Sequence, residues 1–83
     1  MTIHFYAGFK TLAQCTEGTL PWSSHLTVAE LRLQLAAHWP AIAKLLERSR
    51  IAVNDQIVED SAQVPENAEI ALLPPVSGGL SSW

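Results

Sequence analysis

The sequence predicts a mixed α+β roll, in which one sheet of about five strands is covered by a main helix and a second, short helix. Residues 2–10 alternate apolar and polar side chains, the period of a half-buried strand. Residues 26–39 carry apolar side chains at helical spacing behind a helix-start signal, and residues 51–60 and 68–76 hold short apolar runs separated by turn residues. The resulting order, β-β-α-(α)-β-β-β, allows the first and last strands to lie side by side at the centre.

The first two strands form a predicted hairpin. The strand in residues 2–10 ends where Gly8 starts a turn or bulge, and a polar stretch follows it. A second strand lies within residues 18–22 and ends near Pro21, because proline has no N–H to donate to a sheet.

Thr27 and Glu30 predict the start of the main helix, since a threonine followed three residues later by a glutamate forms a capping box. At 100° per residue the apolar side chains share one stripe, which would pack on the sheet. This stripe consists of Val28, Leu31, Leu35 and Trp39. Pro40 ends this helix and suits the first turn of a second one. The second helix presents an apolar face of Ile42, Leu45 and Leu46.

The last three strands follow from two short apolar runs around Asn54-Asp55 and a final run that closes at Pro74-Pro75. Asn and Asp favour the tight turn of a hairpin, and proline suits the end of a strand. This order of elements is that of the β-grasp, or ubiquitin-like, fold, which we expect for residues 1–75.

Composition limits the function. The chain has 83 residues, of which 48% are hydrophobic and 16% charged, so we expect one compact domain without a deep pocket for a substrate of its own. Five scattered Lys and Arg residues and a net charge of −3 argue against nucleic-acid binding. No apolar run reaches the roughly 20 residues that span a bilayer, the first residues do not resemble a signal peptide, and Cys15 is the single cysteine, so we expect a cytoplasmic protein.

Three segments carry a family resemblance: "HFYAGFKTLAQ" near the start, "AVN" at Ala52–Asn54, and "ALLPPVSGG" from Ala71 to Gly79. With them the chain resembles the MoaD/ThiS family of ubiquitin-like sulfur carriers, and within it most closely the small subunits of molybdopterin synthase. The resemblance covers residues 2–79. It departs at residues 80–83, since family members usually stop at the second glycine.

The resemblance implies a non-catalytic carrier whose terminal carboxylate, on Gly79, is the reacting group. A MoeB/ThiF-like activating enzyme would use Mg-ATP to adenylate this carboxylate, and a sulfur donor would convert the adenylate to a thiocarboxylate. A MoaE-like large synthase subunit, or another sulfur-accepting enzyme, would then receive the sulfur, in the first case to build the dithiolene of the molybdenum cofactor. No cofactor is expected on this chain itself.

The chemistry of the tail agrees with such a role. Six residues at roughly 3.3 Å each reach about 20 Å, enough to enter a partner's cleft. Prolines keep the base extended, whereas glycines without a Cβ pass a narrow channel. The predicted inserted residues are Pro74, Pro75, Val76, Ser77, Gly78 and Gly79, of which residues 76–79 form a flexible tail.

In this sequence the carbonyl of Gly79 belongs to an amide with Leu80, and an amide cannot attack ATP as a carboxylate does. We therefore expect a precursor that is cut between Gly79 and Leu80, and the resemblance implies a JAMM-type zinc metalloprotease for this step. Alternatively, residues 80–83 are a cloning remnant or an inert extension of a homologue that carries no sulfur.

The final strand predicts a partner surface, because both of its faces are apolar although one suffices to meet the helix. The candidates are Phe5, Tyr6, Leu72 and Leu73, with the outward parity left open. Alternatively, the short helix and loops cover both faces. A metal site is not expected, since His4, His25 and His38 lie far apart in the sequence. Besides the sulfur carrier, the tail fits a ubiquitin-like modifier joined through Gly79 to target lysines, or a plain binding domain.

Overall fold

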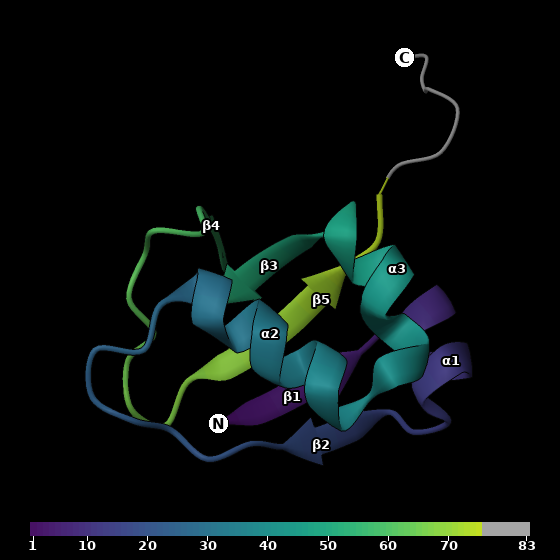
Figure 1. The fold of residues 1–83 in the computed structure, drawn as a ribbon, viewed down its shortest axis with the longest axis horizontal. Helices are drawn as coiled ribbons and strands as arrows, with labels where there is room; N and C mark the ends of the chain where they lie inside the picture. Colours follow the sequence, from purple (N-terminus) through teal and green to yellow (C-terminus); the bar gives the residue numbers. More distant parts are fainter. Residues whose placement is uncertain (76–83) are drawn as a thin grey trace.

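The computed structural model describes residues 1–75 and contains one five-stranded sheet (Figure 1). The strands are β1 (Thr2–Phe5), β2 (Glu17–Thr19), β3 (Arg50–Val53), β4 (Gln56–Val58) and β5 (Glu69–Leu73), in the spatial order β2-β1-β5-β3-β4. The central pair, β1 and β5, is parallel, and the three other pairs are antiparallel. The predicted mixed sheet, with its first and last strands adjacent at the centre, is confirmed.

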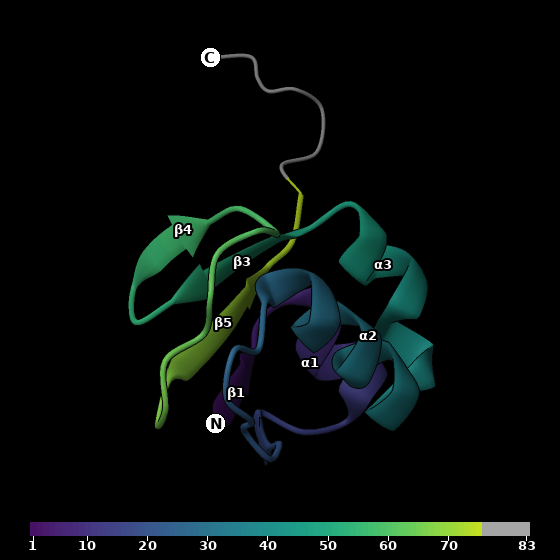
Figure 2. The same ribbon diagram turned by 60° about the vertical axis from the view of Figure 1, so that its left-hand side comes forward.

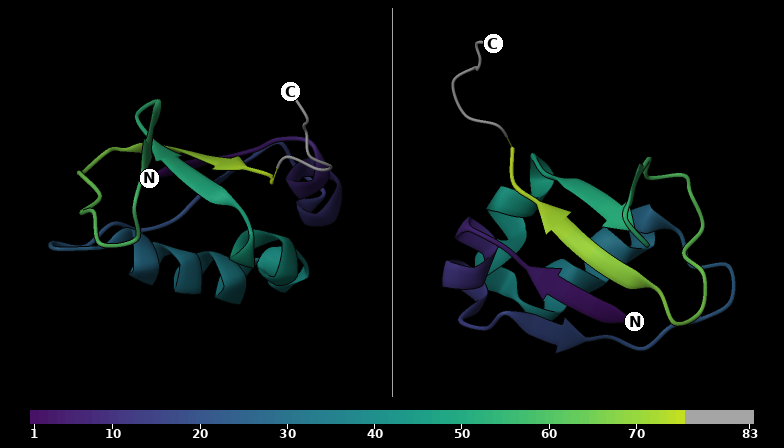
Figure 3. Two further views of the ribbon diagram at one scale, coloured as in Figure 1. Left: turned by 90° about the horizontal axis from the view of Figure 1, so that it is seen from above. Right: turned by 180° about the vertical axis from the view of Figure 1, so that it is seen from behind.

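The helices cover one face of this sheet (Figure 2; Figure 3, left). They are α1 (Gly8–Ala13), α2 (Val28–His38), the 3-10 turn η1 (Pro40–Ile42) and α3 (Ala43–Glu47). Seen from behind, no helix of residues 1–75 lies over the opposite face of the sheet (Figure 3, right). No helix in the described part of the chain combines the length and apolar character needed to cross a membrane.

The segment after β1 differs from the sequence prediction. Gly8 begins helix α1 rather than a turn or bulge, and the hairpin connection therefore contains a helix. The physical reason is Phe9, whose side chain is fully buried and draws this segment over the end of the core. The second strand was also placed too late, since β2 ends at Thr19, before Leu20 and Pro21.

Helix α2 begins as predicted. The Thr27 side chain accepts a hydrogen bond from the Glu30 backbone N–H at 3.3 Å, and the Glu30 carboxylate accepts one from the Thr27 N–H at 2.9 Å. The predicted stripe faces the sheet, with three residues fully buried: Val28, Leu31 and Leu35. Leu33, outside the stripe, is 73% exposed, and Pro40 begins η1 after the helix.

The core lies between the helices and the inward face of the sheet. Each central strand contributes alternate side chains to it: Ile3 and Phe5 from β1, Ile51 and Val53 from β3, Ile70 and Leu72 from β5. Trp39 closes one side, with its ring edge-on to Phe5 at 5.0 Å between ring centroids. Ile42 and Leu46 close another side, and Leu45, the third residue of the predicted face, is partly buried against the core.

Candidate functional site

The alternation of β1 and β5 divides the predicted partner surface. Phe5 and Leu72 are 1% and 0% exposed, so both belong to the core and their assignment to a partner surface was wrong. Tyr6, just after β1, is 51% exposed, and Leu73 at the end of β5 is partly exposed. The outward parity is therefore that of Tyr6 and Leu73, because side chains alternate between the two faces of a strand.

The open face of the sheet carries an apolar surface, which we call the outer patch. It consists of Tyr6, Ile57, Ala71 and Leu73, with Ala52, itself only 5% exposed, between Ala71 and Ile57. The register places Ala52 opposite both Ala71 and Ile57, so small side chains fill the middle of the patch. Ile57 is 55% exposed although it belongs to a strand. An apolar surface without a helix over it is the expected character of a docking face.

One side of the outer patch is bordered by polar contacts. The His4 ring nitrogen Nε2 lies 2.6 Å from a carboxylate oxygen of Glu69, across the central parallel pair. The rings of His4 and Tyr6 are stacked, with centroids 6.4 Å apart and an angle of 17° between their planes. His4 thus contacts both Glu69 and the half-exposed Tyr6 at the border of the outer patch.

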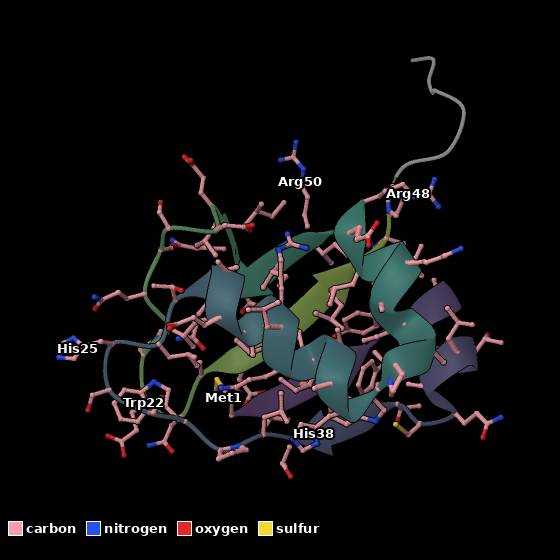
Figure 4. All side chains as sticks on the ribbon, viewed as in Figure 1. Met1, Trp22, His25, His38, Arg48 and Arg50 are labelled. Atoms are coloured by element: carbon pink, nitrogen blue, oxygen red, sulfur yellow. The ribbon has the colours of Figure 1, made fainter. Side chains whose placement is uncertain are left out.

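The outer patch continues into a groove where the chain leaves the sheet, which we call the tail-base groove. It is lined by Arg48, Arg50, Ile57, Leu73, Pro74 and Pro75. Arg50 pairs with Leu73 across β3 and β5, so a guanidinium and the last strand residue meet at the same end of the sheet. Figure 4 shows Arg48 and Arg50 projecting from the edge of the molecule at which β5 ends.

The remaining predicted site residues are divided by where the described chain ends. Pro74 and Pro75 follow β5 directly and form part of the tail-base groove. The other tail residues (Val76, Ser77, Gly78 and Gly79), the junction with Leu80 and the extension lie outside residues 1–75. Cys15 is partly buried against the core. Within residues 1–75 no three His, Cys, Asp or Glu side chains gather that could hold a metal ion.

The sequence prediction missed Arg48, Arg50 and Ile57. Arg50 and Ala52 share the outer face of β3, and Ile57 is opposite Ala52, so alternation plus the β3–β4 register would have placed Arg50 and Ile57 on that face. Arg48 precedes β3 and has no such signal. That register depends on the turn at Asn54-Asp55, which was correctly predicted: both residues have positive φ, 49° and 70°. The missing information was the pairing of β3 with β5, a contact distant in sequence.

With this geometry in place, the chain can be compared with known proteins. A family model described as ThiS family matches residues 3–79, which include the glycine pair and all of the sheet except Thr2, the first residue of β1. This chain belongs to the ThiS family. Residues 80–83 lie beyond the part of this ThiS-family chain that the model matches.

Individual relatives and solved structures are similar to this chain over most of its length. The molybdopterin synthase sulfur carrier subunit of Arabidopsis thaliana is 28% identical over 74 residues, which are 89% of this chain and 77% of that protein. The structure of SAMP1 from Haloferax volcanii has a TM-score of 0.81 at 20% identity, covering 94% of this chain and 97% of that one. Subunit 1 of the Helicobacter pylori molybdopterin-converting factor, solved in complex with subunit 2, has a TM-score of 0.66 at 23% identity, covering 94% and 96%. The ThiS-family chain thus has the ubiquitin-like β-grasp fold of MoaD-type sulfur carriers.

Proposed function

We propose that this ThiS-family protein is the precursor of a sulfur carrier, in which a thiocarboxylate on Gly79 donates sulfur in molybdopterin biosynthesis. The observation that carries the proposal is the family match, which extends beyond Pro75, the last described residue, to Gly78-Gly79. The fold supports it, because β5 ends at Leu73 and the chain continues directly into Pro74-Pro75, which line the tail-base groove. The reacting group is a backbone carboxylate, and no side chain of this chain takes part in the reaction.

The first step of the proposal is proteolysis. Hydrolysis of the Gly79–Leu80 amide leaves a carboxylate on Gly79, and we assign this step to a separate protease, of the JAMM zinc type in our hypothesis. The zinc belongs to the protease. In the following step, a MoeB/ThiF-like enzyme uses Mg-ATP: the Gly79 carboxylate oxygen attacks the α-phosphorus and pyrophosphate leaves. A sulfide-level donor then attacks the acyl carbon, the bond to AMP breaks, and a thiocarboxylate remains.

We propose a MoaE-like large subunit as the sulfur acceptor in this pathway. The complex of the two Helicobacter pylori subunits supports a partner of this kind for a protein with this fold. The outer patch offers it an apolar surface, with Ile57 and Tyr6 each about half exposed. In this arrangement the patch docks on the partner and the six residues from Pro74 to Gly79 enter its active site. We place these steps in the cytoplasm.

The ubiquitin-like modifier is the second candidate. The high fold similarity to SAMP1, described in a related structure as a small archaeal modifier protein, fits it as well. Cleavage and adenylation are common to the two routes, and the difference follows afterwards. A carrier accumulates a thiocarboxylate and is returned unchanged, whereas a modifier forms an amide with a lysine of its target. Conjugates of higher mass that survive boiling in reductant would therefore favour the modifier.

The test compares residues 1–79 with residues 1–83, each incubated with the activating enzyme, Mg-ATP and a sulfide donor and analysed by intact mass. We expect the shorter form alone to gain the mass of one oxygen replaced by sulfur. The matched control is Gly79→Ala in the shorter form, which keeps a carboxylate but adds a methyl group at the reacting residue, and should react far more slowly. Equal reaction of the 1–83 form would overturn the precursor hypothesis.

A further inference from the structure

The tail-base groove combines an apolar floor with two cations. Ile57, Leu73 and the two prolines supply the apolar surface, and Arg48 and Arg50 border it. Acidic residues outnumber Lys and Arg by eight to five in the whole chain, so two cations at one groove run against the overall charge. Within residues 1–75 the ion pairs are His4–Glu69 and Arg32–Asp60, and neither groove arginine has a carboxylate partner there.

The backbone that carries these two arginines is fixed by a third. Arg32 of α2 donates from one terminal guanidinium nitrogen to the Leu46 carbonyl oxygen at 2.7 Å and from the other to the Ser49 carbonyl oxygen at 2.8 Å. Ser49 is itself buried, and its hydroxyl donates to the Leu45 carbonyl oxygen at 2.6 Å. The segment between α3 and β3 is thus held on both sides of Arg48. A partner therefore meets two cations on a preorganised backbone, which lowers the entropy lost on binding.

Position decides which partner meets the groove. Gly79 lies four residues beyond Pro75, so its carboxylate reaches at most about 15 Å from the groove. Any enzyme that binds this carboxylate must bring the mouth of its tail channel close to Arg48 and Arg50. Once cleavage has exposed the Gly79 carboxylate, both of its proposed fates begin with adenylation, so the activating enzyme is the partner that binds this carboxylate on either route.

We propose that the tail-base groove is a recognition site for the activating enzyme, in which Arg48 and Arg50 bind carboxylates that flank the enzyme's tail channel. The inference rests on the proposed adenylation of Gly79. Guanidinium groups bind carboxylates through paired, charge-assisted hydrogen bonds, so the groove orients the carrier as well as attracting it. The enzyme surface it fits has acidic residues around an apolar centre, which covers Ile57 and Leu73.

The test is pyrophosphate exchange catalysed by the activating enzyme with the 1–79 form as substrate, measured at several salt concentrations. The variant is R48Q/R50Q, and the matched control is K10Q/K44Q, which removes two positive charges from exposed lysines outside the groove. We expect R48Q/R50Q to raise KM for the carrier about tenfold or more with little change in kcat, and to weaken the salt dependence of KM. The control should change KM less than about twofold.

Three outcomes would overturn the inference: an unchanged KM in R48Q/R50Q, an equal rise in both double variants, or a fall in kcat alone. Equal rises would mean general electrostatic attraction rather than recognition at the groove. The thermal unfolding midpoint of R48Q/R50Q should match that of the parent, since both side chains are exposed. If the parent 1–79 form shows no exchange at all, the proposed function fails. If the parent and R48Q/R50Q show the same exchange, only the inference about the groove fails, so the two failures are distinguishable.

Discussion

Asn54 and Glu69 exchange two hydrogen bonds between the β3–β4 turn and the start of β5. The Asn54 backbone N–H donates to the Glu69 carbonyl oxygen at 2.9 Å, and the Glu69 N–H donates to Asn54 Oδ1, also at 2.9 Å. Asn54 adopts a φ of 49°, which few residues other than glycine and asparagine accept easily. One residue thus joins the β3–β4 turn to the start of β5, the central strand that leads to the tail.

This relationship predicts different costs for two substitutions of Asn54. Asn54→Gly keeps the turn but removes the side-chain acceptor, and should cost about 0.5–1.5 kcal/mol of unfolding free energy. Asn54→Ala loses the same acceptor but, unlike glycine, keeps a Cβ at positive φ without the side-chain hydrogen bond that helps asparagine adopt this angle, so it should cost about 1 kcal/mol more than the glycine variant. Urea unfolding measures both, with Asp55→Gly as the control because it removes neither bond. Equal stability of the Gly and Ala variants would contradict the role assigned to the backbone angle.

The elements that were predicted correctly are those with local signals. Thr27 and Glu30 lie three residues apart, and the apolar stripe of α2 repeats within one helix, so neither depends on distant contacts. The Asn54-Asp55 turn is likewise set by its own residues. Helix α1 lacked such a signal: its N-cap, Ala7, makes no side-chain capping bond, and its position depends on burial of Phe9 in a core formed by later elements.

Only part of the candidate site could be predicted, because the rest depends on contacts between residues far apart in the sequence. The surplus of apolar residues in β5 indicated a second apolar face, but the outward parity became clear only once Ile70 and Leu72 were placed under the helices. The tail-base groove could not be assembled from the sequence, because Arg50 and Ile57 come to lie beside Leu73 only through the pairings of β3 with both β4 and β5.

The parity of β5 makes a pair of neighbouring leucines a test of the site. Leu72→Ala should cost about 2–5 kcal/mol of unfolding free energy, because it leaves a cavity in the core. Leu73→Ala should cost less than about 1 kcal/mol but raise KM in the adenylation assay, because Leu73 lines the tail-base groove. Denaturant unfolding and pyrophosphate exchange on the 1–79 form separate the two effects. Similar stability losses in both variants would contradict the assignment of faces.

Arg32 is predicted to stabilise the segment between α3 and β3 through its hydrogen bonds to backbone carbonyls, rather than through its surface ion pair. Arg32→Met should cost about 2–3 kcal/mol, because the carbonyl oxygens of Leu46 and Ser49 lose charged donors. Asp60→Asn is the control: it weakens only the bond from Arg32 Nε, at 2.9 Å, to a carboxylate that is 56% exposed, and should cost less than about 1 kcal/mol. Thermal unfolding would show the difference, and equal small losses would reduce Arg32 to a surface ion pair.

Two glycines are expected to respond oppositely to alanine. A Cβ on Gly18 would lie 2.6 Å from Trp39 Cζ2, closer than atoms can approach, so Gly18→Ala should displace the indole and cost about 1–3 kcal/mol. A Cβ on Gly8 would meet only the mobile end of Leu45, at 3.2 Å, and alanine favours the first turn of α1. Gly8→Ala should therefore be neutral or slightly stabilising. Near-UV circular dichroism would detect the Trp39 displacement, and an unchanged signal in Gly18→Ala would contradict this packing.

Phe9 tests whether helix α1 is part of the folded core. Phe9→Ala should cost about 3–5 kcal/mol, since the ring is 0% exposed and its loss leaves a large cavity. Leu12→Ala is the matched control within the same helix, where a side chain that is 43% exposed should cost less than about 1 kcal/mol. Because the unfolding free energy of small domains is about 5–15 kcal/mol, the Phe9 variant should be largely destabilised while the control remains folded. Equal stability of the two variants would mean that this segment behaves as the turn and polar stretch that the sequence predicted from Gly8 onward.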